Sequence, residues 1–392
     1  MASDGDFRVV LIDSARQWER YQDRWDRLAD RVTDATAFQR FRFLRTWWRH
    51  FGADKRLYIV VAEKGGRLCG ALPLQIAERR KLGRRYRVLE FIGMPDELDR
   101  PRLLVPGDSD ALWAALMEGL SRDDRAWDLI QLDELENGGA EIARLSRWAR
   151  NRGLWHWITP LHPVPYLEKT GGFEDYLAGR SRKLRKSLRN SRNRAQRELG
   201  IRYEEADDPD AVTRLLDVFF RIERASWKAA EQRDVGRIAA YPAFYRELLT
   251  GTPEFQPHAI VQYLGGEPSA ATFGFRQGGE YYALQIAHDH RFDRYSPGTL
   301  LESFEMERFF ANPELRRYEF LGGSGFNKRR WTATASATST FRAYRPGPWT
   351  ALGTAAKFYL LPAGRALFGN RPGKRPDHPA PFEIERATPP DR

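Results

Sequence analysis

The sequence predicts an α+β fold built from two similar halves in tandem, each a mixed, mostly antiparallel sheet flanked by helices. Three observations lead to this fold class. The chain has 392 residues, more than one ordinary hydrophobic core accommodates. Hydrophobic residues make up 42% and aromatic residues 13% of the chain, enough to fill two cores. A pattern of strands, helices and glycine turns recurs after about 200 residues, which indicates an internal repeat.

Each half opens with a strand and an amphipathic helix, continues with a second helix and a hairpin, and closes with a Pro-Gly turn, a helix and a strand. The hairpin turns are Gly65-Gly66 and Gly265-Gly266, and Gly-Gly between two β-rich runs is a hairpin signal. The Pro-Gly turns are Pro106-Gly107 and Pro297-Gly298. The expected strands are Phe7–Asp13, Leu57–Glu63, Arg67–Ile76, Trp127–Leu132, Ile201–Ala206, His258–Leu264, Pro268–Arg276, Tyr281–His288 and Tyr318–Leu321; the expected helices include Ala15–Arg31, Phe41–Phe51, Ser181–Leu199, Asp210–Lys228, Tyr241–Leu249 and Thr299–Phe310.

Prolines at Pro160–Pro165 mark the expected boundary between the halves. We predict a first domain at residues 1–160, a second at 161–345 and a terminal segment at 346–392. The terminal segment has an apolar stripe at helical spacing over residues 349–369. This stripe predicts either a helix packed on the body or a helix lying on a membrane surface. The proline-rich end from Arg371 is expected to be a disordered tail.

Composition limits the possible functions. The single cysteine, Cys69, excludes an intrachain disulfide and a cysteine-based metal site. Met1–Val10 has neither the basic nor the apolar part of a signal peptide, and no run of about 18 apolar residues occurs. A cytoplasmic location is therefore expected, with peripheral attachment to the inner membrane face as an alternative. The net charge of +11 favours an anionic partner: nucleic acid, an anionic membrane or a polyanionic small molecule.

The loop before the helix Thr299–Phe310 has the physical features of a diphosphate site. Pro297 presets the backbone angle at the helix start, and Gly298 removes a Cβ atom where a ligand would approach. The free N–H groups and partial positive charge of a helix N-terminus attract phosphate oxygens. An ordinary Ser-Pro helix cap is the alternative. The polar side chains expected at this cradle are Arg291, Arg294, Ser296 and Thr299.

The matching loop of the first half differs in charge. It places Asp108 and Asp110 at the corresponding helix start. Carboxylates satisfy a helix N-terminus and repel a phosphate there. We therefore expect the second half to bind the anionic ligand, and the first half to be structural or to face another substrate.

A series of motifs resembles the CelD/BcsL-type acetyltransferases of the GNAT superfamily over roughly residues 7–345. The resemblance implies a tandem GNAT fold related to the FemABX peptidyltransferases, with transfer from acetyl-CoA or another acyl-CoA to an amine or hydroxyl. It also implies a role in exopolysaccharide, cellulose or cell-envelope synthesis, and CoA pyrophosphate at the cradle described above. The motifs are Phe43–Gly52 (FLRTWWRHFG), Pro165–Glu168 (PYLE), Ser181–Gly200, Ala225–Lys228 (ASWK), His288–Leu301 and Tyr318–Trp331.

Direct acyl transfer needs a group that takes a proton from the acceptor, and it needs no covalent nucleophile. Asp289 matches the acidic position of the family's strand-end motif. Glu319 and Lys328 are further candidates to line the acceptor cleft, with a structural ion pair as the alternative. His288 and His290 point the same way on a strand, but no third ligand accompanies them, so no metal is predicted.

Ser181–Leu199 predicts a helix with one apolar stripe and an otherwise basic surface. We predict that Arg185 and Arg189 contact an anionic acceptor, lipid or RNA, with a solvated amphipathic helix as the alternative. Trp227 and Lys228 end the following helix and are candidates for acceptor binding, although Trp227 also suits a core.

Two other functions stay open. The family often has Asp where this chain has Glu319, and Gly-Asp-Glu-x-Tyr-Lys where this chain has Gly-Ser-Gly-Phe-Asn-Lys at 323–328. These departures favour a non-catalytic scaffold that binds an anionic polymer or a membrane surface. The basic surface and the FemABX relation instead allow an aminoacyl-tRNA-dependent transferase, which would bind RNA in a salt-sensitive way.

Overall fold

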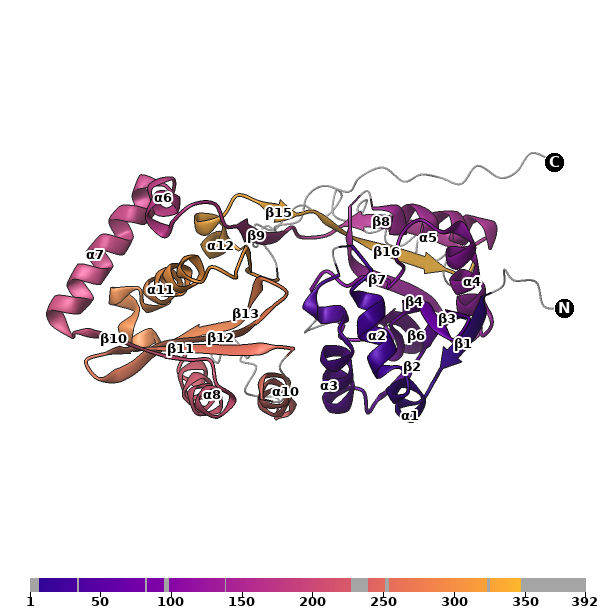
Figure 1. Ribbon diagram of the computed structural model, residues 1–392, viewed down its shortest axis with the longest axis horizontal. Helices are drawn as coiled ribbons and strands as arrows, with labels where there is room; N and C mark the ends of the chain where they lie inside the picture. The colour runs from indigo at the N-terminus through magenta and orange to yellow at the C-terminus, as the bar shows by residue number, and fades with distance from the viewer. Residues whose placement is uncertain are drawn as a thin grey trace. The chain divides into compact units, whose positions relative to one another are not determined.

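A computed structural model describes residues 7–33, 35–81, 83–94, 99–137, 139–226, 239–250, 254–322 and 325–346 (Figure 1). The chain divides into two compact units. The first holds the described part of Met1–Trp48, Gly52–His162 and Ala337–Arg392, and the second holds that of Arg49–Phe51 and Pro163–Ser336. Trp227, Lys228, the predicted helix at 349–369 and the predicted tail lie outside the described residues.

The first unit contains a three-stranded sheet, in the order β1-β3-β4, and a six-stranded sheet, in the order β2-β5-β6-β7-β16-β8. All neighbours pair antiparallel except β6 and β7, which are parallel. Its strands are β1 (Arg8–Ile12), β2 (Lys55–Leu57), β3 (Ile59–Lys64), β4 (Arg67–Leu72), β5 (Leu74–Lys81), β6 (Arg84–Phe91), β7 (Leu129–Glu136), β8 (Trp155–Pro160) and β16 (Thr338–Tyr344). Its helices are α1 (Ala15–Glu19), α2 (Gln22–Ala29), η1 (Ala37–Gln39), α3 (Phe41–Phe51, without its last three residues), α4 (Asp110–Ser121) and α5 (Ala140–Asn151).

The second unit contains a seven-stranded sheet in the order β10-β11-β12-β13-β14-β9-β15. Here β13 and β14 form the parallel pair, and the other neighbours are antiparallel. Its strands are β9 (Val164–Glu168), β10 (Ile201–Ala206), β11 (Gln256–Leu264), β12 (Glu267–Gln277), β13 (Glu280–His288), β14 (Arg317–Glu319) and β15 (Ala335–Ser336). Its helices are α6 (Phe173–Ala178), α7 (Arg182–Glu198), α8 (Pro209–Arg224), α10 (Ala240–Leu249), η3 (His290–Tyr295), α11 (Pro297–Ala311) and α12 (Phe326–Trp331).

The structure confirms the predicted α+β class, with two units of mixed, mostly antiparallel sheet flanked by helices. The two Gly-Gly hairpins are present as well. Gly65 and Gly66 have φ angles of 57° and 76°, and Gly265 and Gly266 have φ angles of 61° and 82°. Positive φ at both central residues is the type I′ requirement that glycine meets without strain.

Helices cover both faces of the second unit's sheet. α8 and α10 lie on one face, and α11, with α7 beyond it, lies on the other (Figure 1). The core on the α11 side includes Leu184 and Leu188 of α7 together with Leu300, Phe309 and Trp331. This packing fixes the N-terminus of α11 beside the end of β13.

Two sequence expectations need correction. The predicted helix Ala15–Arg31 is two helices, α1 and α2, separated at Arg20 and Tyr21, and no proline or glycine marks this break in the sequence. The predicted second domain ended at residue 345, but β16 pairs with β7 and β8 of the first unit. No strand was predicted at Thr338–Tyr344 from the sequence, and a local pattern does not show which sheet a late strand completes.

Candidate functional site

A cavity of about 280 Å³ opens at the N-terminus of α11 in the second unit. It brings together the predicted Ser296, Gly298 and Thr299 with the end of β13 and with groups that the sequence analysis did not name. The lining residues are Ser226, Ile286, Ala287, His288, Asp293, Ser296, Pro297, Gly298, Thr299, Glu302 and Asn327.

The N-terminus of α11 has no side-chain cap. Ser296, its N-cap residue, has φ 55° and ψ 51°, a left-handed conformation unusual for a residue other than glycine. Thr299 and Leu300 donate to the Ser296 carbonyl, while no described residue accepts from the Gly298 N–H. Pro297 at the first helical position has no N–H to satisfy. The first turn of α11 therefore presents a free amide toward the cavity.

The corresponding helix of the first unit, α4, is capped. The Ser109 side chain accepts a hydrogen bond from the Leu112 amide at 3.3 Å. Asp110 in the first turn accepts from Arg144 at 2.5 Å, and Asp108 lies 3.6 Å from the same guanidinium group. Each of these acids thus pairs with a cation of its own unit, and an anionic ligand would meet carboxylates there. The structure therefore shows the contrast predicted from the two halves of the sequence: acids at the start of α4 and none at the start of α11.

Gly298 allows a close approach between α11 and β13. A Cβ atom at this position would lie 3.3 Å from His288 Nδ1, closer than ordinary van der Waals contact. The His288 ring is held by a hydrogen bond between Nε2 and Asp293 at 3.1 Å. Glycine therefore keeps the mouth of the cavity open where the helix passes the strand.

β13 has an open edge that leads to this cavity. It pairs in parallel with β14 over three positions only, Glu280 with Arg317, Tyr281 with Tyr318 and Tyr282 with Glu319. Beyond this fork, Ala283 and residues 285–288 pair with β12 on one side, and no described strand pairs with their other edge. A strand edge without a neighbouring strand is a place where an extended ligand can lie alongside the backbone.

Asp289 is held by its neighbour. Its carboxylate, 2% exposed, accepts from the Arg291 backbone N–H and from Arg291 Nε, both at 2.9 Å. Burial opposes ionisation, but the hydrogen bonds from Arg291 outweigh it and lower the pKa of Asp289. Asp289 thus caps the start of η3. It is not among the residues that line the cavity.

The two cradle arginines turn away from the cavity. Arg291 pairs with Asp289 at 2.8 Å and with Glu267 at 3.3 Å. Arg294 pairs with Glu198. A different cation reaches the α11 N-terminus: Arg330 of α12 donates to the Thr299 hydroxyl at 3.2 Å. Its position near Thr299 depends on the fold of the loop after β14, which sequence spacing could not reveal.

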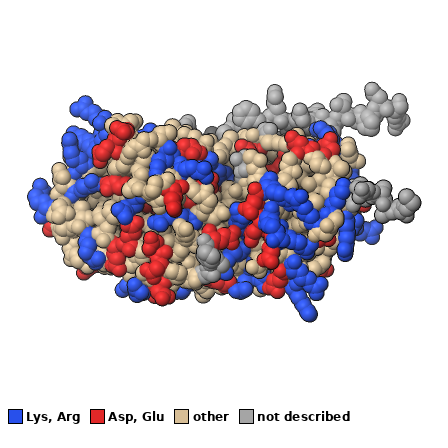
Figure 2. All heavy atoms as spheres, viewed as in Figure 1, with Lys and Arg blue, Asp and Glu red and all other residues tan. Residues whose placement is uncertain are grey.

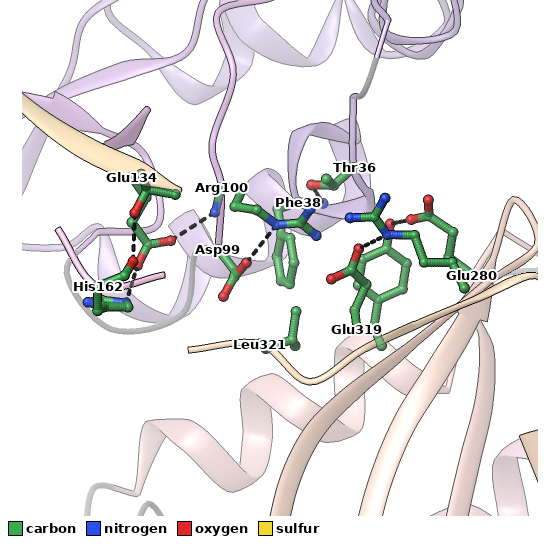
Figure 3. Close-up of polar contacts among 12 residues, drawn as sticks. Thr36, Phe38, Asp99, Arg100, Glu134, His162, Glu280, Glu319 and Leu321 are labelled. Carbon is green, nitrogen blue, oxygen red and sulfur yellow. Dashed lines mark hydrogen bonds and ion pairs between the residues drawn. The ribbon is translucent and has the colours of Figure 1, made fainter. Parts of the chain in front are cut away.

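Glu319 lies at the fork between β13 and β14. It is 1% exposed and accepts from Arg317 Nε at 2.6 Å (Figure 3). Lys328 of α12 donates to the Leu321 carbonyl, and Leu321 has a positive φ of 53°. Glu319 thus sits where the open edge begins, while Lys328 fixes the turn that follows the strand.

The two predicted acceptor residues that the structure describes lie away from the cavity lining. Arg185 and Arg189 are exposed on α7 and do not line it. Trp227 and Lys228 lie outside the described residues, next to the cavity residue Ser226 in the sequence. Among the described residues, no three His, Cys, Asp or Glu side chains are grouped as a metal site requires.

Glu302 is one of the cavity residues that the sequence analysis missed. It lies one turn after Gly298 on α11 and accepts from Trp331 Nε1 at 2.9 Å. Burial, reinforced by the nearby Glu305, raises the pKa of Glu302 to about 7, although the Trp331 hydrogen bond and the charges of Arg330 and Lys328 act in the opposite direction. Its spacing from the Pro-Gly turn was the available signal, since a residue four positions after Gly298 shares its helix face.

Glu302→Gln should stabilise the protein at pH 8 and change its stability little near pH 5. The folded pKa of about 7 exceeds the reference value of 4.5, so folded Glu302 holds its proton more tightly and stability falls as pH rises between these values. The gain at pH 8 over pH 5 should be about 2 kcal/mol. Urea unfolding at both pH values measures it. Glu307→Gln, on the same helix and with a side chain that is 33% exposed, is the matched control. An equal gain at both pH values would contradict the raised pKa of Glu302.

A buried network of hydroxyl groups holds α11 on the sheet. The Glu305 carboxyl accepts from Tyr281 at 2.7 Å, Tyr318 at 2.6 Å and Thr272 at 3.1 Å. Each of the four side chains is 2% exposed. Burial and the Glu305 charge raise the pKa of both Tyr281 and Tyr318, so their hydroxyls stay protonated as donors. The network fixes α11 against β12, β13 and β14, and thereby positions the cavity.

Comparison with known proteins gives a family match for part of the chain and fold matches for most of it. Residues 182–329 match the family model described as an acetyltransferase (GNAT) domain. The crystal structure of FemX is similar with a TM-score of 0.58 and 11% identity, covering 84% of this chain and 98% of that one. A conserved protein of unknown function from Bacteroides thetaiotaomicron VPI-5482 is similar with a TM-score of 0.50 and 12% identity, covering 86% of this chain and 100% of that one. No curated protein matches.

The family match places a GNAT-type acyltransferase fold in the second unit, over α7 to α12 and thus over the whole α11 cavity. The likeness to FemX, at its low identity, shows a shared fold. The CelD/BcsL subtype stays a prediction. Within the described residues, no helix is long and apolar enough to cross a membrane.

Proposed function

We propose that the protein transfers an acyl group from an acyl-CoA to an amine or hydroxyl acceptor, and that its second unit binds the donor. One observation carries this proposal: the open edge of β13 runs from the fork at Glu319 to the uncapped N-terminus of α11. An extended ligand with amide groups at one end and a diphosphate at the other fits these two features together. CoA has that arrangement.

The diphosphate is assigned to the first turn of α11. The Gly298 amide, the Thr299 hydroxyl and the helix dipole supply donors and positive potential. Arg330, 3.2 Å from the Thr299 hydroxyl, supplies the cation that the sequence analysis expected from Arg291 and Arg294. Glu302 beside them, with its pKa raised to about 7, is largely uncharged below that pH and so avoids repelling an anion.

The reacting thioester is assigned to the fork, where the pantetheine arm would leave the open edge. Glu319 lies there and is our choice for the group that takes the acceptor's proton. Arg317 holds its carboxylate in place by donating a hydrogen bond to it. Asp289 already binds Arg291, and Lys328 already binds the Leu321 carbonyl, so we assign both to holding the loops around the cavity. The resemblance to CelD/BcsL-type proteins favours an acceptor in exopolysaccharide or cell-envelope synthesis.

Calorimetric titration with CoA, acetyl-CoA and pantetheine tests the donor assignment. CoA and acetyl-CoA should bind with micromolar dissociation constants, and pantetheine should bind far more weakly because it lacks the diphosphate. Equal affinity for pantetheine would contradict the α11 assignment. Absence of CoA binding together with salt-sensitive binding of total tRNA would favour an aminoacyl-tRNA-dependent transferase, and absence of both would favour a non-catalytic scaffold.

A further inference from the structure

Helix α7 is basic on the sides that face solvent. Its 17 residues include a single acid, Glu198, and its buried stripe consists of Leu184, Leu188 and Ala195. These apolar residues belong to the core of the second unit. The rest of the helix surface is dominated by cations: Arg182, Lys183, Arg185, Lys186, Arg189, Arg192, Arg194 and Arg197.

This charge pattern works against the stability of the helix itself. The first turn has no acid and begins with Arg182 and Lys183, where the helix dipole favours negative charge. Arg182 and Lys186, and likewise Arg185 and Arg189, are like charges four positions apart, which destabilises a helix. A sequence selected for helix stability alone would alternate the signs, so a partner outside the fold best accounts for the pattern.

The first half of α7 lacks compensating acids within the fold. No carboxylate of the described residues lies within salt-bridge distance of the five exposed cations between positions 182 and 189. The paired cations lie in the second half, where Arg192 contacts Glu307 at 2.7 Å and Arg197 contacts Glu198 at 3.1 Å. Figure 2 shows blue side chains gathered where Figure 1 places α7. This surface, residues 182–189, is the unneutralised part of the helix.

The shape of the surface restricts its partner. Arg182, Lys186, Arg189 and Arg197 are spaced along the outer face, opposite the buried stripe, over about 22 Å of straight helix. The apolar stripe is already buried, so α7 cannot insert into a hydrocarbon layer. The exposed face of α7 has no aromatic side chain on which a nucleobase could stack. A convex, straight row of cations matches a flat anionic surface.

We infer that the outer face of α7 docks the protein on the anionic headgroups of a phospholipid bilayer, by charge and without insertion. Each Lys or Arg near such a surface contributes attraction that falls off within a Debye length. Arg and Lys side chains can bind lipid phosphates in the headgroup layer. This inference is independent of the proposed acyl-CoA site, because no residue of α7 lines the α11 cavity.

Vesicle co-sedimentation of the full chain tests this inference. Bound protein should increase with the fraction of phosphatidylglycerol in phosphatidylcholine vesicles and decrease as KCl rises from about 50 to 300 mM. The double variant Lys186→Glu/Arg189→Glu should bind at least tenfold more weakly. Its melting temperature should not fall, because the new acids form favourable pairs with Arg182, Arg185 and Arg192 on the same helix.

Arg214→Glu/Arg221→Glu is the matched control, since both arginines are exposed on α8 and the same number of charges is reversed. This control should keep most of the vesicle binding. The inference fails if both double variants lose binding equally, if binding ignores the phosphatidylglycerol content, or if a 20-base-pair RNA duplex outcompetes the vesicles at equal phosphate concentration. The Lys186→Glu/Arg189→Glu variant should bind CoA as the natural protein does. CoA titration of this variant therefore distinguishes a failure of membrane docking from a failure of the donor assignment.

Discussion

Gly298→Asp should weaken CoA binding by at least about 100-fold while the protein stays folded. The substitution gives the α11 N-terminus the acidic character that Asp108 and Asp110 give to α4. A carboxylate there would occupy the free amide and lie next to the diphosphate. Two like charges about 4 Å apart near a protein surface repel by roughly 4 kcal/mol, which exceeds the 2.7 kcal/mol or so of a 100-fold change. Calorimetric titration measures the loss.

Two further variants separate charge from size. Gly298→Asn adds nearly the same volume without the charge, and Gly298→Ala adds only the Cβ atom that would lie 3.3 Å from His288 Nδ1. Both should bind CoA more weakly than the natural protein, because His288 must shift, yet much better than Gly298→Asp. If the Asp and Asn variants bind equally, steric hindrance alone explains the effect and the diphosphate does not sit at this helix end.

The parts of the fold that follow from local sequence were predicted well. The helix Phe41–Phe51 and the strand Ile201–Ala206 begin and end where they were expected. Both Gly-Gly turns form hairpins, because glycine supplies the positive φ that such turns require. These features depend on residues close together in the chain, so the sequence pattern carries them.

Parts that depend on distant residues were not predictable in the same way. The strand Thr338–Tyr344 completes the sheet of the first unit, next to β7 and β8. Its own pattern of residues is equally compatible with the second unit, which precedes it in the chain. Strand partners are chosen by register and packing across the fold, and a single sequence shows neither.

In the site, too, residues placed by local sequence were predicted and residues placed by distant contacts were not. Ser296, Gly298 and Thr299 line the cavity as their place at a helix start predicted. Arg291 and Arg294, only a few residues away, instead meet Glu267 and Glu198. An arginine reaches several ångströms from its backbone, so the nearest acid decides its direction, and that acid is often far away in the sequence. Arg330 was missed for this reason, whereas Glu302 was missed although its helical spacing from Gly298 can be read from the sequence.

Glu305→Ala should lower the free energy of unfolding by about 3 kcal/mol or more. The substitution leaves the hydroxyls of Tyr281, Tyr318 and Thr272 without their shared acceptor in a site that is 2% exposed. Each buried polar group that loses its partner costs about 1–3 kcal/mol. Urea unfolding followed by circular dichroism measures the change. Glu307→Ala, whose half-exposed side chain pairs with Arg192 at the surface, should change stability by less than about 1 kcal/mol.

The same substitution should also weaken CoA binding, because Glu305 anchors the helix that carries Gly298. The two residues lie on one face of α11, two turns apart, and the anchor joins that face to β13 and β14. Glu305→Gln keeps one acceptor oxygen and should therefore lose less stability and less CoA affinity than Glu305→Ala. If Glu305→Ala is as destabilised as expected but its folded form binds CoA normally, the network supports the fold alone, and α11 keeps its position through apolar packing by Leu300, Met306 and Phe309.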